Sequence, residues 1–466
     1  MKRILSFMIA AALLFALFPG AALSAADDPA GEGVSAPAAP DAEPAAPAAP
    51  EAAVRDPSGG GPAEAGEAPA NTVEAARLAT IRYGTETEIA ALIQILKSEG
   101  SGYLDGELAA LAENTRNQSI LSGLFTFFGD REKSGLEDRA IRALEERYEE
   151  TGETVLSAAE YLGKVKAVRA IPALRELLDS GEQRFMNTAF RALGRAGGAD
   201  AGEGDEIAEY LVDYYSSRDP ADENRREIIT ALGAAGSGKG VAFLSEIAEN
   251  SGERTTLRIA ALDSLSKIGD PGGLRAILAS IGAGDPNVRS AAVAALGPFS
   301  GEDVDRAILE AFRDSYYRTR LAAAQAARQR GLEAAIPYLK FRAERDDVPQ
   351  VKDEAIRALG AIAGEESKRI VEGFFSERKN SDRVRLVSAE MLMKNEPAKY
   401  LDKMIAELDE AKRRNQTPLY NGFLKVIGES RTENLEAITR RFLKDGGILE
   451  KSYGLDMAAN NNLASL

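Results

Sequence analysis

The side chains that this chain lacks limit its chemistry more than those it has. Its 466 residues include no cysteine and no histidine. The chain can therefore form no disulfide, no thiolate nucleophile, no Cys/His zinc site and no Ser-His-Asp triad. Catalysis would have to use carboxylates, Lys, Tyr, Ser or Thr, and no pair of acidic residues stands out. We assign no catalytic residue, no cofactor-binding residue and no metal ligand.

One stretch is similar to a phosphate-binding loop. The sequence "GAAGSGKG" at 233–240 supplies Gly233, Gly238 and Lys239 of the pattern G-x-x-x-x-G-K-[ST]. Gly240, however, replaces the hydroxyl residue that should hold Mg²⁺. The preceding "REIITAL" favours a helix, whereas the motif requires a strand. We interpret this stretch as a turn between helices.

A basic and aromatic segment at 312–345 is the first candidate for binding. It holds eight basic and three acidic residues inside an acidic chain, with aromatic residues between the bases. Such a surface could bind an anionic protein, a cell-wall polymer or lipid headgroups; alternatively, the aromatic residues belong to the core and the bases to an ordinary charged surface. Nucleic acid is not expected for an exported acidic protein. The candidate partner-binding residues are Arg313, Tyr316, Tyr317, Arg318, Arg328, Arg330, Lys340 and Arg342.

A second set of bases recurs at a fixed position in six consecutive repeats. We expect a structural role, in which each base bonds an acidic residue or a helix end in the adjoining unit. Asp222, Asp285 and Asp382 are the acceptors that the sequence suggests. The alternative is a row of charges that holds an acidic partner. The ladder consists of Arg225, Arg258, Arg289, Arg320, Lys352 and Arg385.

These residues are positioned by a helix that recurs along the chain. "VRSAAVAALG" at 288–297 returns as "LRIAALDSLS" at 257–266 and "VKDEAIRALG" at 351–360. Successive copies lie 31 to 39 residues apart, which is typical of helical solenoids. Two looser copies centre on Thr80 and Thr126. The anchor positions are Leu162, Leu193, Leu232, Leu265, Leu296, Ala327, Leu359, Leu392 and Ile427.

Each copy predicts an amphipathic helix that needs a neighbour. An apolar residue precedes the anchor by eight positions and a small one, such as Ala261 or Ala292, by four, so all three share one helix face. A second helix follows, and two helices alone cannot cover their own apolar faces. Gly follows the anchor in six units, where we expect a left-handed helix end: Gly163, Gly194, Gly233, Gly297, Gly360 and Gly428.

The phrase "DPNVRSAAVAALG" (285–297), followed by a short second helix, resembles HEAT-like repeats of the short, phycobilisome-lyase type. The resemblance covers roughly residues 72–445 and suggests an exported bacterial member of this superfamily. It implies an all-α solenoid, a superhelical array of about eleven helix pairs. It also implies a protein-binding scaffold, because most members of the superfamily serve that purpose.

The N-terminal part of the chain predicts export. Lys2 and Arg3 precede an apolar run and small residues, a pattern typical of a cleaved signal peptide at 1–26; the alternative is an uncleaved anchor. Residues 27–71 are rich in Ala, Pro and Glu, carry a net charge of −8, and predict a disordered linker. We expect atypical helical repeats at 72–150, the regular solenoid at 151–445 and a fraying tail at 446–466.

The sequence favours a non-catalytic scaffold in the periplasm or cell envelope that binds a protein partner on the solenoid surface. A first alternative is an envelope element that binds peptidoglycan or lipid headgroups through the basic patch. A second is a carboxylate-dependent glycan hydrolase. Beyond the signal peptide we expect no transmembrane segment and no cofactor, and we expect the protein to be periplasmic or extracellular.

Overall fold

The computed structural model describes residues 70–218, 222–362 and 364–463. Within these ranges the chain forms 24 α-helices, α2 to α25, and no β-strand, which confirms the all-α prediction. The expected signal peptide and nearly all of the expected linker lie outside the described residues. No helix within these ranges combines the length and apolar character that crossing a bilayer requires.

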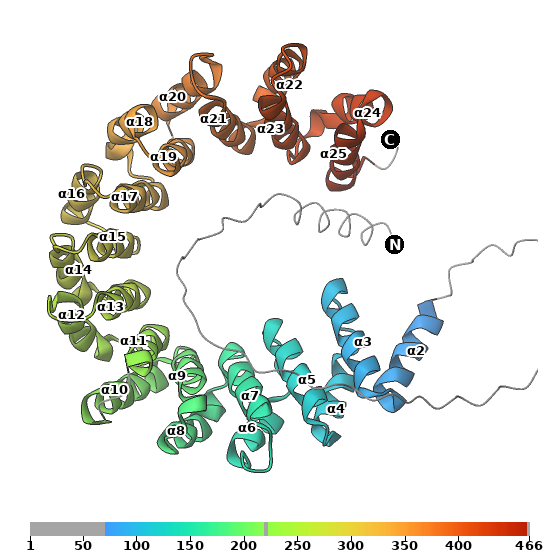
Figure 1. The fold of residues 1–466 in the computed structure, drawn as a ribbon, viewed down its shortest axis with the longest axis vertical. Coiled ribbons are helices and arrows are strands. Elements are labelled where there is room, and N and C mark those ends of the chain that lie inside the picture. The colour runs from blue at the N-terminus through green and yellow to red at the C-terminus, as the bar shows by residue number, and fades with distance from the viewer. Residues whose placement is uncertain (1–69, 219–221, 363, 464–466) are drawn as a thin grey trace, which may run out of the picture. The chain divides into compact units, whose positions relative to one another are not determined.

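The odd-numbered helices form one layer, on the concave side of the array, which we call the inner layer (Figure 1). Each of them packs against the next odd-numbered helix. The inner layer consists of α3 (Glu86–Glu99), α5 (Gln118–Asp130), α7 (Gly152–Lys164), α9 (Gln183–Gly197), α11 (Asp222–Ala235), α13 (Thr255–Ile268), α15 (Pro286–Ala295), α17 (Tyr317–Arg330), α19 (Pro349–Ala361), α21 (Asp382–Asn395), α23 (Thr417–Gly428) and α25 (Ile448–Asn460).

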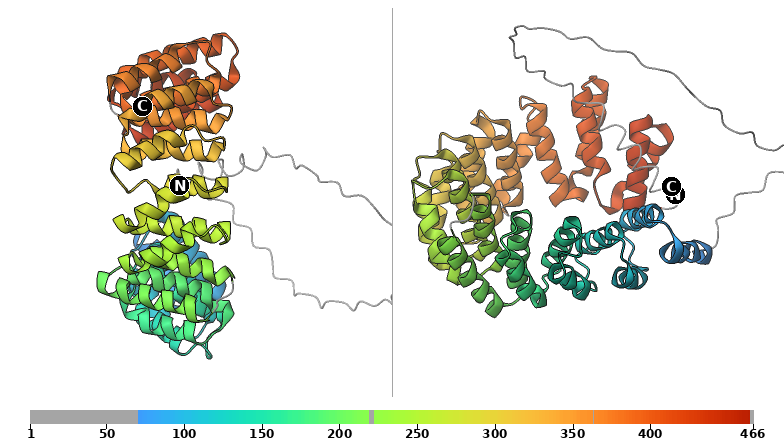
Figure 2. Two further views of the ribbon diagram at one scale, coloured as in Figure 1. Left: turned by 90° about the vertical axis from the view of Figure 1, so that its left-hand side faces the viewer. Right: turned by 60° about the horizontal axis from the view of Figure 1, so that its bottom comes forward.

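The even-numbered helices form the outer layer, and Figure 2 shows successive pairs lying against one another along the array. Five of them follow a short 3-10 turn, such as Gly238–Gly240, which contains the end of the "GAAGSGKG" stretch. The outer layer consists of α2 (Ala70–Tyr83), α4 (Asp105–Asn114), α6 (Glu137–Glu145), α8 (Ile171–Asp179), α10 (Ala201–Arg218), α12 (Val241–Glu249), α14 (Leu274–Ser280), α16 (Glu302–Ala311), α18 (Ile336–Arg345), α20 (Glu365–Ser376), α22 (Pro397–Arg413) and α24 (Glu436–Asp445).

Eleven inner–outer pairs, α3–α4 to α23–α24, make up the solenoid, with α2 and α25 at its two ends. The nine anchors lie between the layers, and each is at most 4% exposed. Burying one large anchor such as Leu296 stabilises the fold by ~1.5–3 kcal/mol. The two looser anchors were placed wrongly. Thr80 belongs to α2, an outer helix, and in α5 the buried position is Phe128 instead of the exposed Thr126.

The expected left-handed helix ends at the repeated glycines are wrong. None of the six has a positive φ; helices α7, α9, α11 and α19 continue past theirs, and α23 includes Gly428 as its last residue. Three of these glycines instead allow the neighbouring inner helix to approach. A Cβ at Gly163 would lie 2.7 Å from the Ala192 Cα, and one at Gly194 would lie 2.5 Å from the Ala231 carbonyl oxygen. At Gly233 the added atom would meet Ser264 within 2.8 Å.

The expected tail at 446–466 is also wrong for most of its length. Residues 448–460 form α25, which packs against α23 and α24. Met457 is fully buried, and a Cβ at Gly428 would meet the Tyr453 ring at 2.3 Å. The segment lacks the repeat's sequence pattern, yet it is held by an inner helix, α23, and an outer helix, α24.

Candidate functional site

The ladder bases bond the ends of outer helices. In four of the six repeats the base donates to a carbonyl at or just beyond the end of the preceding outer helix: Arg258 to Ala248 (3.0 Å), Arg289 to Ala283 (3.0 Å), Arg320 to Asp314 (3.0 Å) and Arg385 to Phe375 (3.1 Å). Lys352 makes a longer contact with the Glu344 carbonyl, at 3.4 Å. The Arg225 guanidinium lies over the Tyr215 ring, 5.6 Å from its centroid. A charged donor beside the free carbonyls of a helix end fixes one helix against the next.

Three ladder arginines also pair with acidic residues that follow the next outer helix or lie on it. Arg289 makes a bidentate contact with Asp314, Arg320 with Asp346, and Arg385 donates to Glu407 at 2.6 Å. The hydrogen bonds from Arg289 hold the pKa of Asp314 below its usual value. Each arginine therefore ties three successive elements together, which suits a residue that sets the angle between repeats.

The acceptors suggested by the sequence are different from these. Asp285 accepts from the Thr255 hydroxyl (2.5 Å) and the Asn287 amide (2.8 Å), as the N-cap of α15. Asp382 lies exposed in the first turn of α21, and Arg385 bonds Glu407 instead. The Asp222 side chain lies outside the described part. The true acceptors stand 22 to 26 residues after their arginines, beyond the reach of a local pattern.

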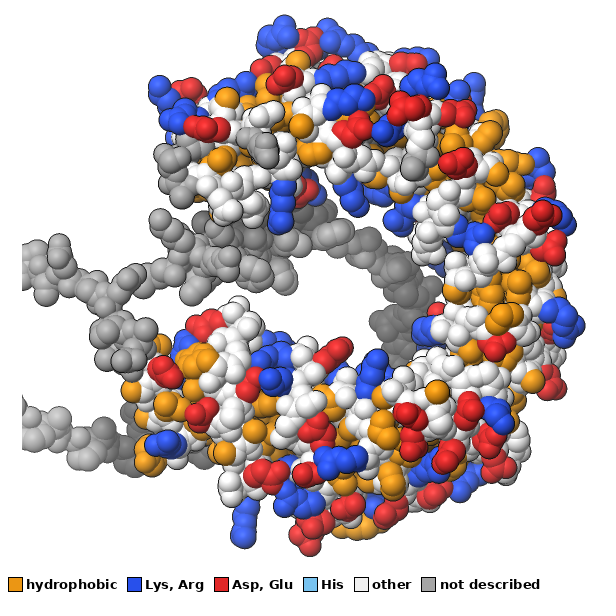
Figure 3. All heavy atoms as spheres, turned by 180° about the vertical axis from the view of Figure 1, so that it is seen from behind, with side chains coloured by type: hydrophobic (Ala, Val, Ile, Leu, Met, Phe, Trp, Pro, Cys, Tyr) orange, Lys and Arg blue, Asp and Glu red, His pale blue; other side chains and the backbone are white. Residues whose placement is uncertain are grey.

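The eight candidate partner-binding residues do not share one surface. Arg313, Lys340 and Arg342 lie on or beside the outer helices α16 and α18. There the Arg313 guanidinium stands 5.5 Å from the Tyr338 ring centroid, and Arg342 stands 5.3 Å from that of the exposed Phe341. Arg330 bonds the Phe299 carbonyl and Asp305 (2.6 Å), so it joins α17 to the preceding pair. On the face shown in Figure 3, acidic and basic side chains are interspersed along the array.

The other four candidates lie on the inner helix α17 or, in the case of Tyr316, at its N-cap. Arg328 donates to Glu354 on α19, at 2.7 Å. Tyr316 donates to Asn287 on α15, at 3.0 Å, and its ring contacts that of Tyr317. Arg318 is exposed and donates to the Tyr317 hydroxyl at 3.2 Å. These bonds orient Tyr317 and Arg318 along one edge of a hollow in the inner layer.

That hollow, which we call the central hollow, spans α13, α15, α17 and α19 and measures about 440 Å³. Partly exposed apolar side chains, Ile259 and Leu321, line it together with small residues of α15 and α17. Amide side chains surround them, and Arg318 is its one charged lining residue among the described residues. The sequence identified Tyr317 and Arg318 but missed the residues on neighbouring helices, which only stacking brings alongside. The lining amides are Asn287, Gln325 and Gln350.

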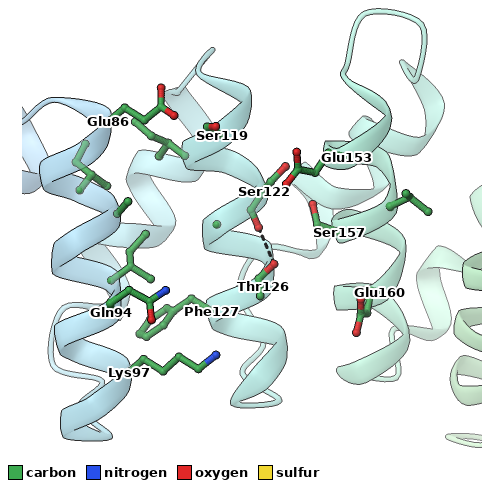
Figure 4. A pocket seen from close by; sticks show the side chains of 16 residues that line it. Glu86, Gln94, Lys97, Ser119, Ser122, Thr126, Phe127, Glu153, Ser157 and Glu160 are labelled. Carbon is green, nitrogen blue, oxygen red and sulfur yellow. Dashed lines mark hydrogen bonds between the residues drawn. The ribbon is translucent and has the colours of Figure 1, made fainter. Parts of the chain in front are cut away.

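A second hollow, which we call the N-terminal groove, lies across α3, α5 and α7 and measures about 430 Å³ (Figure 4). It exists because the inward-facing residues of α5 are small: Ser119, Gly123 and Thr126. A Cβ at Gly123 would meet nothing closer than Ile93 Cδ1, at 3.9 Å. The floor is apolar, whereas the sides carry Glu86, Glu153 and Glu160. The apolar floor consists of Ile89, Ile93, Ile120, Phe127 and Leu156.

The N-terminal groove is lined by three acidic residues and one basic residue. Its one basic residue, Lys97, donates to Asp130 at 2.5 Å. Glu160 pairs with Lys164 at 3.0 Å, and Glu153 forms no hydrogen bond or ion pair within the described residues. Hydrogen bonds from Asn117 and Ser119 lower the pKa of Glu86. The sequence pointed only to an atypical region here, because the pattern of one helix does not reveal a gap between three.

Residues 81–466 match the family described as Spirochaete HEAT repeat protein. No curated protein matches the chain. Among solved structures, the chain is similar to Kap121p (12% identity, TM-score 0.40), over 83% of this chain and 49% of that one. It thus spans about half the length of Kap121p. It is also similar to human deoxyhypusine hydroxylase (20% identity, TM-score 0.24), over 64% of this chain and 97% of that one. An engineered protein matches at 16% identity and a TM-score of 0.29, over 83% of this chain and 94% of that one.

Proposed function

Because this chain belongs to the Spirochaete HEAT repeat protein family, we propose that it is a non-catalytic scaffold that holds a protein partner on its inner layer. The central hollow is the observation that carries this proposal. It leaves Ile259, Leu321 and Tyr317 partly exposed around a cavity of about 440 Å³. Apolar side chains left open to water beside oriented polar groups are the usual basis of a protein-binding surface.

The electrostatics support binding over catalysis. A general acid in a glycan hydrolase needs a carboxyl pKa that is raised. In the described part of the chain, the carboxyl groups with a resolved shift, such as Glu86, Asp314 and Glu372, have lowered pKa values. Hydrogen bonds from the Asn117 amide to Glu86, from Arg289 to Asp314 and from the Tyr400 hydroxyl to Glu372 favour the ionised forms. This arrangement suits ion pairing and recognition better than proton donation.

The basic residues of segment 312–345 are divided between the inner and outer layers, which favours a protein partner over an anionic polymer. A polymer or lipid surface would require several free cations on one face. Arg330 instead bonds Phe299 and Asp305, Arg328 bonds Glu354, and Arg313 pairs with Glu310. Arg318, at the edge of the central hollow, remains exposed toward a partner. We propose that the protein binds this partner in the periplasm or cell envelope, because residues 1–26 have the pattern of a signal peptide.

Site-specific photocrosslinking in cells tests the proposal. A benzophenone amino acid at Leu321, in the central hollow, is expected to crosslink one discrete protein. The matched control is the same amino acid at Phe341, which is 55% exposed on the outer helix α18. Arg318→Glu combined with Leu321→Glu should abolish capture from a third inner position, Gln325. Equal crosslinking from Leu321 and Phe341, or none from Leu321 and Gln325, contradicts the proposal. N-terminal sequencing of the mature protein tests export, with a start after Ser24 or Ala26 expected.

A further inference from the structure

The N-terminal groove combines an apolar floor with sides of one charge. Ile89, Ile93 and Phe127 are buried beneath it, and Ile120 and Leu156 remain partly exposed within it. An apolar side chain of a ligand would cover the exposed atoms of Ile120 and Leu156 and gain ~25 cal/mol for each Å² removed from water. Gly123 leaves room for such a side chain, because it has no side chain of its own and the nearest atom to a Cβ there is 3.9 Å away.

The lining of the groove offers no unpaired cation among the described residues, because Lys97 already binds Asp130. Glu86, Glu153 and Glu160 are exposed; Glu160 pairs with Lys164, whereas Glu153 forms no ion pair within the described residues. Figure 4 shows Glu153 and Glu160 on α7, with Glu86 across the groove at the start of α3. A ligand with bases on both sides of an apolar residue could therefore pair with carboxylates on both sides of the groove. An anionic lipid surface would be repelled by the same groups.

The described chain has no β-strand whose edge could pair with an extended peptide. Recognition in this groove must therefore rely on side chains, as when an amphipathic helix lies in a groove between helices. We propose that the N-terminal groove docks an amphipathic helix of the partner protein, with its apolar face on the floor and Lys or Arg residues along both flanks. This inference rests on the proposed scaffold function and adds a second contact, separate from the central hollow.

A designed peptide tests the groove directly. The probe is a fluorescein-labelled helix about four turns long, with Leu on one face and Lys along both flanks; its counterpart has Glu in place of Lys. Fluorescence anisotropy with the full folded chain should detect binding of the Leu/Lys peptide that weakens as salt is added, and no binding of the Leu/Glu peptide. Equal binding of both peptides would overturn the proposal.

Variants then locate the site. Glu153→Lys combined with Glu160→Lys should weaken binding at least ~10-fold, because both charge contacts become repulsive. Glu107→Lys combined with Glu206→Lys makes the same charge change at exposed positions on the outer helices α4 and α10 and should change binding less than ~2-fold. Equal losses in the two double variants would mean that the peptide responds to net charge alone, and the groove would be excluded.

Filling the groove with a larger uncharged side chain tests whether peptide binding needs the shape of the groove as well as its charge. Gly123→Leu should remove binding by occupying the floor, whereas Gly123→Ala adds a single atom at an ordinary van der Waals distance, 3.9 Å from Ile93 Cδ1, and should retain it. Circular dichroism and the urea midpoint show whether each variant remains folded. If Gly123→Leu folds and still binds the peptide, the proposal fails. If the peptide tests contradict the groove proposal but Leu321 still crosslinks a partner protein, the proposed scaffold function stands without the groove.

Discussion

The Arg320 guanidinium donates to both carboxylate oxygens of Asp346, at 2.8 and 2.9 Å. Both side chains are buried, and the same guanidinium donates to the carbonyls of Asp314 and Ser315 at 3.0 Å. The pair thus joins α17 to the end of the preceding outer helix and to the loop after the next one. The pair therefore helps to fix the angle between these repeats.

Removing the acceptor of this pair should destabilise the array strongly. Asp346→Ala leaves the buried Arg320 with only the exposed carboxylate of Asp347, at 2.8 Å. Loss of a buried partner costs ~3–5 kcal/mol in comparable cases. Glu310→Ala is the control, because the Glu310–Arg313 pair is about 60% exposed and should contribute less than ~1 kcal/mol. The free energy of unfolding from urea titration measures both. Equal losses would contradict the role assigned to Asp346.

Acid should weaken the neighbouring link through Asp314. Its pKa is lowered by hydrogen bonds from Arg289, so its contribution to stability is complete above the unfolded pKa of ~3.9 and is lost as the pH falls through the lower folded value. Asp314→Asn should therefore be less stable than the wild type at neutral pH. The difference should shrink below pH ~4. Urea midpoints measured across this range check the prediction, and a constant difference would contradict it.

The glycine after the anchor should tolerate no added atom. Gly194→Ala would place a Cβ 2.5 Å from the Ala231 carbonyl oxygen and should cost ~1–3 kcal/mol by forcing α9 and α11 apart. Gly373→Ala is the control in α20, where an added Cβ meets nothing within 4 Å. That change should stabilise the chain by ~0.5–1 kcal/mol, because alanine favours a helix. Thermal unfolding distinguishes them, and equal effects would show that close approach is not what requires Gly194.

The last helix should depend on Glu450. Burial alone would raise the pKa of this carboxyl, but hydrogen bonds from Tyr420, Gly447 and Lys412 outweigh it and lower the pKa to about 2. Its contribution is therefore present above pH ~4.3 and lost as the pH falls toward 2. Glu450→Gln should lower the opening free energy of α25 by ~1.5–3 kcal/mol at neutral pH.

Hydrogen exchange of residues 448–460 measures that opening. Glu436→Gln serves as the control, because the Glu436–Arg440 pair is about 60% exposed on α24. Exchange in α25 should be faster in Glu450→Gln and unchanged in Glu436→Gln. Rapid exchange of this segment in the wild-type chain would support a frayed tail instead of a packed helix.

Much of the fold could be predicted because its signal is local. The spacing of an anchor, a small residue four positions before it and an apolar residue eight positions before it defines one helix face, and these positions are buried in repeat after repeat. The looser N-terminal copies were misplaced, since Thr80 and Thr126 resemble anchors only by their neighbours in sequence. The C-terminal helix was missed because it packs without the repeat's full set of apolar positions.

The candidate site could be predicted only in fragments. Tyr317 and Arg318 were identified from composition, whereas Ile259, Asn287 and Gln350 meet them only through stacking. The basic segment appeared continuous in sequence, but α17 and α18 belong to different layers and divide it. The N-terminal groove left no sequence signal, because it arises where small residues of α5 lie between longer ones of α3 and α7.

The sequence by itself determined which residues become helical and which face of each helix is buried, because helical periodicity is a property of adjacent residues. It also excluded every chemistry that requires histidine or cysteine. Only the tertiary structure decided which carboxylate each ladder arginine binds, which glycines allow close approach and where the inner layer is hollow. Those features depend on distances between helices from different repeats, and such distances are fixed by packing and not by the order of residues along one helix.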